Sequence, residues 1–274
     1  MKLNAVVALA TFISTLIGCS EPKTNTKPVD DTEWKTEAQV LKRIENVNFN
    51  FPANGNAFDN KNDLVEECFE AMESNLQLIE LDAFTDTIQI RFLRSRKDMK
   101  VLTGMGATGI AQPHINTLYV VADSSEKVKP PIKHELMHLI AMLKWGYPHY
   151  NSTWINEGLA ALAENNCNGY NVAEIYRYLL ETDKLIHVDS LTTSFYSQSE
   201  MISYHQSAYV VEYLLKNYSI EQFKRFWSEG FEHFESIYGI GFQEMKTNLE
   251  KSVTKQYPDV PNIDWESFEE GCMK

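Results

Sequence analysis

Two histidines stand four residues apart in a segment that the sequence predicts to be an almost wholly apolar helix. His134 and His138 belong to the segment 130–145, where most other side chains are those of Leu, Ile, Met and Ala. Positions four apart share one face of a helix, so both imidazoles can reach the same ion. A helix that is apolar nearly all round is a buried helix, and polar groups inside it are costly without a partner. The segment therefore predicts a buried helix that carries a metal site.

Two glutamates complete the set of residues that such a site needs. Glu135 projects about 100° round the helix from His134, where it can act as a general base on a water that zinc activates. Eighteen residues separate His138 from Glu157, which lies in a second predicted helix over 154–165. Two histidines and one glutamate with an open fourth position make a catalytic zinc site. We therefore predict one Zn²⁺ per chain, bound by His134, His138 and Glu157.

The spacing of these residues resembles that of a known group of enzymes. His-Glu-x-x-His, 18 residues, then Trp-x-x-Glu-Gly-Leu-Ala resembles the gluzincin metallopeptidases, the group of thermolysin and the M1 aminopeptidases, and most closely their peptidase MA-like members. The resemblance covers about 130–165, and 204–214 is similar to the Tyr-x-x-Gly/Ser-Ala helix of the aminopeptidases. It implies a zinc metallopeptidase in which Glu135 takes a proton from water and passes one to the leaving amine.

The same resemblance implies a role for a tyrosine further along the chain. In the family, a tyrosine hydroxyl stabilises the oxyanion of the tetrahedral intermediate, and Tyr204 occupies the matching position. The alternatives are that His205 takes this role, or that Tyr204 is only a half-buried helix residue.

Two departures from the family pattern refine the expected activity. The aminopeptidases carry a Gly-x-Met-Glu-Asn motif whose glutamate binds the substrate's free amine, but 104–112 contains no acidic residue. An endopeptidase is therefore favoured over an exopeptidase, and we expect 117–122 to be the edge strand along which an extended substrate pairs. Thermolysin-type enzymes place an acid four residues after the ligand glutamate to orient a histidine. This chain has Ala161 there, and Glu164 is the nearest substitute.

Two other functions are compatible with these motifs. One is a catalytically silent lipoprotein that binds or assembles other proteins on a metallopeptidase scaffold. The other is a zinc hydrolase that acts on a non-peptide amide, such as a cell-wall crosslink. The intact Glu135 argues against the silent protein.

The N-terminus has the layout of a secretory signal. Lys2 precedes the apolar run 5–17, which is shorter than the roughly 20 residues of a transmembrane helix. Leu16-Ile17-Gly18-Cys19 resembles the lipobox of bacterial lipoproteins, which implies removal of residues 1–18 and lipidation of Cys19. The polar segment 19–33 reads as a flexible tether. We therefore expect a lipid-anchored protein of the bacterial envelope, on the outer membrane and facing either the periplasm or the surface.

Composition excludes some partners and suggests others. The net charge of −13 and the pI near 5.0 exclude nucleic acid, because phosphate binding needs clustered Lys and Arg. The glycines of 104–109 lack the Gly-Lys-Ser/Thr ending of a nucleotide-binding loop. The expected partners are a protein or peptide substrate and, through the lipid, a membrane. No feature of the sequence indicates an oligomeric state.

The remaining cysteines allow one disulfide. Cys68, Cys167 and Cys272 would lie in an oxidising compartment. A Cys167–Cys272 pair would tie the C-terminal tail to the catalytic lobe, while the absence of any bridge is equally compatible with the sequence. None of the three has the spacing of metal ligands, so we do not place zinc on cysteine.

Periodicity predicts an α+β fold. N-terminal helices and a small, mainly antiparallel sheet would form a sub-domain over 34–129, packed on a mostly helical zinc-peptidase sub-domain over 130–274 with the active-site cleft between them. The other predicted elements are helices over 34–48 and 63–79, strands over 87–93, 110–112 and 117–122, and a largely helical segment from 170 to about 253 with breaks near 189–198, at 230 and at 239–241.

Overall fold

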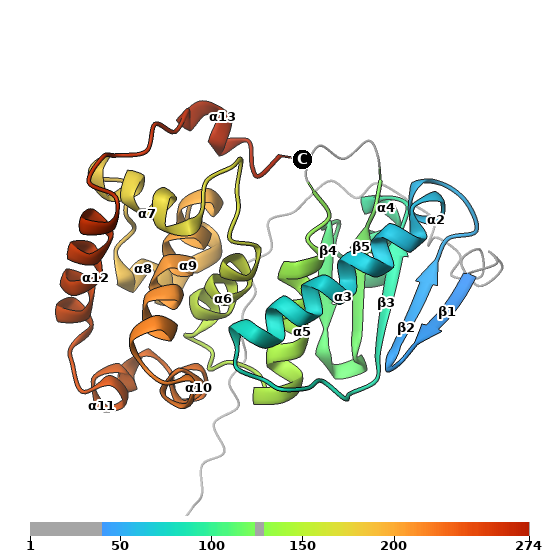
Figure 1. The fold of residues 1–274 in the computed structure, drawn as a ribbon, viewed down its shortest axis with the longest axis horizontal. Coiled ribbons are helices and arrows are strands. Elements are labelled where there is room, and N and C mark those ends of the chain that lie inside the picture. The colour runs from blue at the N-terminus through green and yellow to red at the C-terminus, as the bar shows by residue number, and fades with distance from the viewer. Residues whose placement is uncertain (1–39, 124–128, 274) are drawn as a thin grey trace, which may run out of the picture.

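The computed structural model describes residues 40–123 and 129–273. In Figure 1 a sheet with its covering helices lies beside an all-helical part, which confirms the α+β class. The predicted signal peptide, the lipidation site Cys19 and the tether lie outside the described residues. The sub-domain limits and the cleft between the lobes stay predictions.

The described chain contains a five-stranded sheet in the order β1-β2-β3-β5-β4. The outer pairs, β1 with β2 and β4 with β5, are antiparallel, and the inner pairs, β2 with β3 and β3 with β5, are parallel. The sheet is thus mixed, whereas the sequence predicts a mainly antiparallel one. Helix α3 returns the chain from β2 to the parallel strand β3, which is what parallel pairing requires. From β3 the chain passes through α4 into β4, and the antiparallel turn from β4 brings β5 parallel to β3. The strands are β1 (Val40–Ile44), β2 (Val47–Phe51), β3 (Ile88–Leu93), β4 (Gly109–Gln112) and β5 (Thr117–Val121).

The first two strands form a hairpin, so the helix expected over 34–48 is wrong in its described part. Val47, Phe49 and Phe51 are each at most 1% exposed and alternate in sequence with asparagines. Glu45 lies in the turn between β1 and β2 and has a left-handed backbone conformation with a φ of 52°. Alternation buries one face of a strand, and this burial outweighs the weak helical spacing of the apolar residues before it.

Helices cover both faces of the sheet. On one face α3 (Lys61–Leu78), which lies across the strands in Figure 1, packs with α5 (Ile132–Trp145). On the other face Met99 of α4 (Arg96–Thr103) joins Leu93 and Val121 in a smaller cluster. The short helix α2 (Asn56–Asp59) precedes α3. The long helix α5 is therefore held against the sheet, as its apolar circumference predicts.

The edge strand next to α5 is β4, and the expectation that 117–122 forms this edge is wrong. All five residues of β5 are buried, because β5 pairs with β3 on one side and with β4 on the other. Within the described residues β4 pairs with β5 alone.

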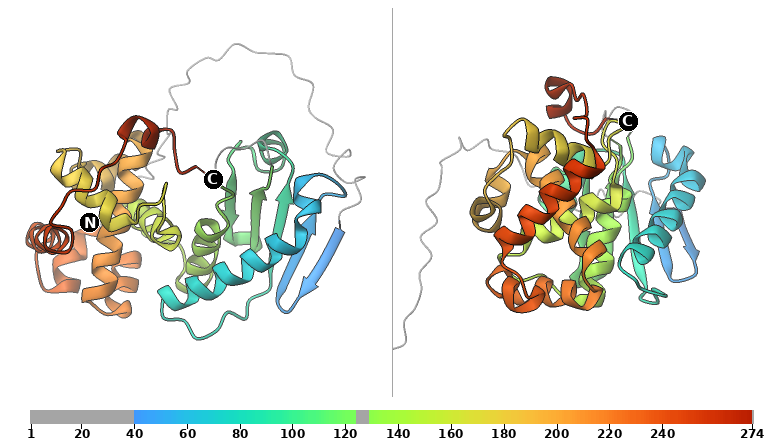
Figure 2. Two further views of the ribbon diagram at one scale, coloured as in Figure 1. Left: turned by 45° about the horizontal axis from the view of Figure 1, so that its top comes forward. Right: turned by 60° about the vertical axis from the view of Figure 1, so that its left-hand side comes forward.

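The second part of the described chain is helical. Figures 1 and 2 show α6 between α5 and α9. In Figure 1 the helices α7, α8 and α12 lie on the far side of α9 from α6. Breaks occur at 230 and 239–241 as predicted, whereas 189–198 is mostly helical. None of the helices in the described ranges is long and apolar enough to cross a bilayer. The helices are α6 (Thr153–Glu164), α7 (Val172–Glu181), α8 (Val188–Ser194), α9 (Glu200–Asn217), α10 (Ile220–Glu229), α11 (Phe234–Tyr238), α12 (Phe242–Gln256) and α13 (Trp265–Glu269), with 3₁₀ turns at Pro113–Ile115, Phe195–Ser197 and Phe231–His233.

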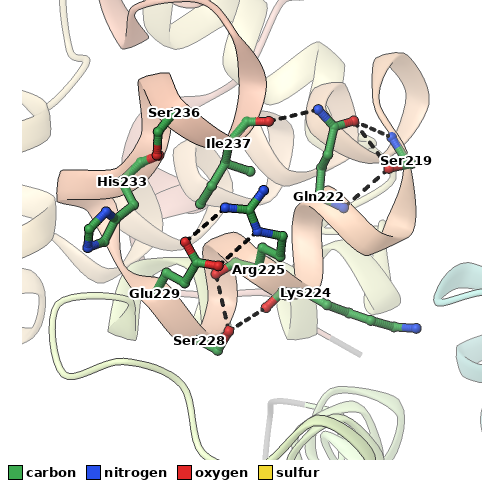
Figure 3. Close-up of polar contacts among 9 residues, drawn as sticks. All are labelled: Ser219, Gln222, Lys224, Arg225, Ser228, Glu229, His233, Ser236 and Ile237. Carbon is green, nitrogen blue, oxygen red and sulfur yellow. Dashed lines mark hydrogen bonds and ion pairs between the residues drawn. The ribbon is translucent and has the colours of Figure 1, made fainter.

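A capping box starts α10 and links it to α11 (Figure 3). The Ser219 hydroxyl oxygen accepts a hydrogen bond from the backbone N–H of Gln222, and the side-chain oxygen of Gln222 accepts one from the backbone N–H of Ser219. The same Gln222 side chain donates to the carbonyl of Ile237 at 2.9 Å. One residue therefore satisfies a helix end and joins two helices across the break at 230.

The C-terminal segment is tied to the helical part by a disulfide. Cys167, just after α6, is bonded to Cys272, and Cys68 is a free cysteine buried in α3. The pairing of Cys167 with Cys272 is the one that the sequence suggests.

A glycine sets the close approach of α6 to α9. A Cβ built on Gly158 would lie 2.8 Å from the carbonyl carbon and oxygen of Ser207 in α9. These are backbone atoms, so neither helix can give way by a change of rotamer. The residue beside Glu157 must therefore be glycine for the two helices to cross at this distance.

We expect Gly158→Ala to destabilise the protein. The overpacking cost of about 1–3 kcal/mol is offset in part by the gain of about 1 kcal/mol that alanine brings to a helix, so urea unfolding should show a net loss of up to about 2 kcal/mol. Gly106→Ala is the matched control, because its Cβ would meet only the Arg96 carbonyl at 3.8 Å. Equal stability of the two variants would contradict the packing argument.

Candidate metal centre

The structure brings three of the predicted site residues together. His134 Nε2 and His138 Nε2, both from α5, lie 3.1 Å apart. Glu157 Oε2, from the facing helix α6, lies 3.4 Å from the first nitrogen and 3.2 Å from the second. His138 and Glu157 are buried and His134 is partly buried. Three donor atoms thus face one another between two packed helices.

These distances fit a tetrahedral zinc ion. Zinc binds imidazole nitrogen and carboxylate oxygen at about 2.0–2.1 Å, which separates neighbouring donor atoms by about 3.3 Å. The observed separations of 3.1 to 3.4 Å bracket that value. All three atoms can act as acceptors, and a cation among them is the partner that satisfies all of them at once. The donor set therefore matches the metal that the sequence predicts.

Asn156 fixes the ring of His138. The side-chain oxygen of Asn156 lies 2.8 Å from His138 Nδ1. An amide oxygen only accepts, so Nδ1 carries a hydrogen and Nε2 is the ring nitrogen that faces Glu157. A second hydrogen bond of this kind commonly orients metal-binding histidines. The role of Asn156 is not predictable from the sequence, although Asn156 directly precedes Glu157, because its partner depends on how α5 and α6 cross.

Charge couples the histidine to the carboxylate. Burial alone would lower the pKa of His138, but the Glu157 carboxylate outweighs burial and raises the pKa to about 9. Burial likewise opposes ionisation of Glu157, yet the two imidazoles hold the pKa of Glu157 well below its usual range. Glu157 is therefore ionised, and the site favours a positive charge between these groups.

Glu135, on α5, lies beside the centre and contacts the edge strand β4. Burial raises the pKa of Glu135, while the backbone amide of Ala111 in β4 donates to its carboxylate and lowers the pKa in part. A Cβ on Gly109 would lie 2.6 Å from Glu135 Cγ and 2.8 Å from its Oε1. Gly109 thus leaves the space that the glutamate occupies. A buried carboxylate with a raised pKa suits a general base.

Glu164 has a different role from the one that its position in the sequence suggests. Its Oε1 accepts from the backbone amide of His134 at 3.1 Å, so the expectation that it orients a histidine ring is wrong. The amides in the first turn of a helix lack partners within the helix. Glu164 therefore satisfies the N-terminal turn of α5, and Asn156 orients the imidazole.

Tyr204, on α9, stacks against the centre. Its ring lies 6.2 Å from the ring of His134, centroid to centroid, at an interplanar angle of 26°. Burial, and then the charge of Glu157, raise the pKa of Tyr204 above its ordinary value. The hydroxyl therefore keeps its proton and can donate a hydrogen bond.

The alternative residue, His205, faces elsewhere. Its Nδ1 lies 2.7 Å from the carbonyl oxygen of Met201, and its Nε2 lies 3.9 Å from Cys272 Sγ. Burial lowers the pKa of His205 to about 4. The geometry therefore favours Tyr204 over His205 as the group beside the candidate metal centre.

Tyr196 contacts the centre and was not identified from the sequence. Its hydroxyl donates to Glu157 Oε1 at 2.8 Å, although 72% of the residue is exposed. Burial of the hydroxyl and the Glu157 charge raise the pKa of Tyr196. Its position in the turn after α8, a segment expected to be a break, gave no signal of this contact. Tyr196 occupies one carboxylate oxygen of Glu157 and leaves Oε2 for the histidines.

We expect Tyr196→Phe to weaken metal binding. The change removes the hydrogen bond to Glu157 Oε1, and loss of such an outer partner lowers zinc affinity about tenfold or more. Zinc competition with a chromophoric chelator measures this. Tyr150→Phe, at a tyrosine that is 81% exposed, serves as the control and should bind zinc like the unaltered protein. Unchanged affinity in Tyr196→Phe would show that the contact does not position Glu157.

Comparison with known proteins identifies the family. No curated protein matches the sequence. One solved structure, an aminopeptidase N family protein from Idiomarina loihiensis, has 12% sequence identity and a TM-score of 0.37. That alignment covers 86% of this chain but 46% of the other, so the chain spans less than half of that structure's length. A family model described as the peptidase MA superfamily matches residues 94–253. Since this match spans more than half of the 274 residues, the chain belongs to the peptidase MA superfamily.

Proposed function

We propose that the protein is a zinc-dependent metallopeptidase of the gluzincin type that hydrolyses internal peptide bonds of protein substrates. The observation that carries the proposal is the convergence of His134 Nε2, His138 Nε2 and Glu157 Oε2 at 3.1 to 3.4 Å beside Glu135. A site that only bound a metal would need the three ligands alone. The buried carboxylate next to them supplies the base that hydrolysis requires.

Each residue of the centre has a defined task in this proposal. When bound, the zinc ion supplies Lewis acidity, which lowers the pKa of water and polarises a carbonyl group. The Glu135 carboxylate takes a proton from the attacking water and transfers it to the leaving amine. Asn156 keeps the lone pair of His138 Nε2 directed at the centre, and Tyr196 holds Glu157 Oε1. The Tyr204 hydroxyl donates to the oxygen on which negative charge develops.

The edge strand supports an endopeptidase. β4 is an edge strand of the described sheet, and its residues Gly109 and Ala111 contact the Glu135 side chain. An extended substrate that pairs with such an edge runs past the base in both directions. The absence of an acidic residue from 104–112 removes the group that would bind a free N-terminal amine.

The proposed location is the bacterial envelope. The lipobox-like Leu16-Ile17-Gly18-Cys19 supports a lipid anchor at Cys19 on the outer membrane, with the enzyme facing the periplasm or the surface. The Cys167–Cys272 disulfide is typical of an oxidising compartment.

We expect Glu135→Gln to abolish cleavage while zinc stays bound. Loss of the base should slow hydrolysis by at least about 10²–10⁴-fold, because glutamine cannot accept the proton. The measurement is cleavage of a denatured, fluorescently labelled protein, with zinc content determined by elemental analysis. Glu66→Gln, on the exposed side of α3, is the control and should remain active.

The outcomes of that experiment separate the alternatives. Full turnover by Glu135→Gln would contradict the mechanism. Zinc binding without cleavage of any protein by the unaltered chain would favour a silent binding protein or a hydrolase of non-peptide amides, and cell-wall fragments as substrates would distinguish these two. Absence of zinc binding would contradict the proposal as a whole.

Tyr204→Phe should lower kcat and leave zinc affinity unchanged. Removal of one donor to an oxyanion costs about 10²–10³-fold in kcat, whereas the ring that stacks on His134 is retained. Tyr196→Phe should show the opposite balance, with weaker zinc binding and near-normal kcat at saturating zinc. Steady-state kinetics at several zinc concentrations distinguishes the two tyrosines. A normal kcat in Tyr204→Phe would exclude it from catalysis.

A further inference from the structure

A second group of metal-binding side chains lies apart from the candidate metal centre. Cys167, His205 and Cys272 each offer a ligand atom, and these atoms lie within 4.8 Å of one another. They come from the segment just after α6, from α9 and from the C-terminal segment after α13. A separation of 105 residues between the two cysteines explains why spacing in the sequence did not indicate a site.

The imidazole of His205 is held in one orientation. Its Nδ1 lies 2.7 Å from the carbonyl oxygen of Met201. A carbonyl only accepts, so Nδ1 carries the hydrogen and Nε2 has an unprotonated lone pair. That lone pair is directed at Cys272 Sγ, 3.9 Å away. Metal-binding histidines commonly have this arrangement, in which a backbone carbonyl accepts from the other ring nitrogen.

The disulfide leaves this lone pair without a hydrogen-bond donor. Neither sulfur carries a hydrogen while Cys167 and Cys272 are bonded to each other. His205 is 8% exposed and Cys167 is 1% exposed, so water has little access to satisfy the nitrogen. An unpaired buried acceptor costs free energy. Reduction supplies the missing partner, because a thiol can donate to Nε2 and a thiolate can share a cation with it.

We propose that reduction of the Cys167–Cys272 disulfide creates a second metal site, in which both thiolates and His205 Nε2 bind Zn²⁺. Tetrahedral zinc with sulfur at about 2.3 Å and nitrogen at about 2.0 Å separates these two atoms by about 3.6 Å. The observed distance between His205 Nε2 and Cys272 Sγ is 3.9 Å. Two thiolates and one imidazole form a known set of zinc ligands, with water in the fourth position.

The reaction balances with a dithiol as the reductant. The dithiol gives two electrons and two protons, its own sulfurs form a disulfide, and the Cys167–Cys272 bond breaks to give two thiols. Both thiols lose their protons when the ion binds. Cys272 is partly buried whereas Cys167 is 1% exposed, so Cys272 is the more accessible of the two cysteines.

The sulfurs must then move apart, and the C-terminal segment allows this. Zinc separates two bound sulfurs by about 3.8 Å. Near the bridge the segment is held by Asn168, which donates to the carbonyl of Gly271 at 3.1 Å and accepts from the amide of Met273 at 2.8 Å. Both bonds involve one exposed side chain, which can follow a small shift of Cys272. The ion would replace the covalent link between this segment and α6.

Metal titration of the full chain carrying Cys19→Ser tests the proposal. With the disulfide intact the protein should bind one Zn²⁺ per chain, and after reduction and removal of the reductant it should bind two. Co²⁺ is the second probe, because thiolate ligands give a near-ultraviolet charge-transfer band that a site of two histidines and a glutamate lacks. The band should appear only in the reduced protein. Thiol titration after denaturation establishes the redox state.

Variants assign the ligands and separate this site from the proposed peptidase centre. Cys272→Ser should lose the second ion and the band, and His205→Gln should bind the second ion at least tenfold more weakly. Cys68→Ser, at the buried free cysteine, is the control and should keep the band. Glu157→Gln should weaken the first site and leave the band unchanged.

Two results would overturn the inference. One is a fully reduced chain that shows no thiolate-to-cobalt band. The other is a band that persists at full strength in both Cys272→Ser and His205→Gln. Loss of peptidase activity or of the first zinc ion bears on the proposed function alone, since the band depends on neither.

Discussion

Three acceptor atoms that face one another in a buried position are the constraint on which this structure depends. Two imidazole nitrogens and a carboxylate oxygen lie within 3.4 Å, an arrangement that is unfavourable unless a positive charge lies among them. The surrounding fold must therefore hold α5 and α6 in place. The sheet and α3 bury α5, and the missing Cβ of Gly158 lets α6 pack directly on the backbone of α9.

The next layer of contacts divides the polar atoms of the centre among separate partners. Glu157 directs Oε2 at the histidines, while Oε1 accepts from Tyr196. The Asn156 side chain accepts a hydrogen bond from Nδ1 of His138, and the Glu164 carboxylate accepts one from the backbone amide of His134. Three of these six residues, Asn156, Glu157 and Glu164, belong to α6. One helix thus supplies a ligand, the group that orients another ligand, and the cap of the helix that carries both histidines.

The two histidine ligands were predictable from the sequence because their geometry is local, whereas Glu157 was predicted from its spacing and the family resemblance. Residues four apart on a helix share a face whatever surrounds them, so His134 and His138 required no knowledge of the fold. Tyr196 and Asn156 were missed because their partners lie on other elements, and only the packing of α6 against α5 and α8 brings them together. The hairpin over 40–51 was mistaken for a helix for a related reason. Its strands are stabilised by pairing and by burial of Phe49, which local spacing does not reveal.

The identity of the edge strand likewise could not be predicted from the local sequence pattern. The pattern of apolar residues located β4 and β5 correctly, but it did not show which of them borders α5. The order of strands follows from the crossover after β3, which places β5 beside β3 and leaves β4 outside. The short strand that contains Gly109 is therefore the one in contact with Glu135, and Gly109 has a steric role that the glycine pattern of 104–109 does not reveal.

Helix α9 contacts both the candidate metal centre and the group formed by Cys167, His205 and Cys272. Tyr204 and His205 are adjacent in sequence and point about 100° apart around the helix, so the first stacks on His134 while the second faces Cys272. Gly158 and Ser207 keep α6 in backbone contact with α9 between these clusters. A rotation of α9 about its axis would displace both side chains together. The C-terminal segment is bonded to Cys167 through Cys272 and packs Phe268 on His205, so it contacts α9 at the residue that follows the tyrosine beside the candidate metal centre.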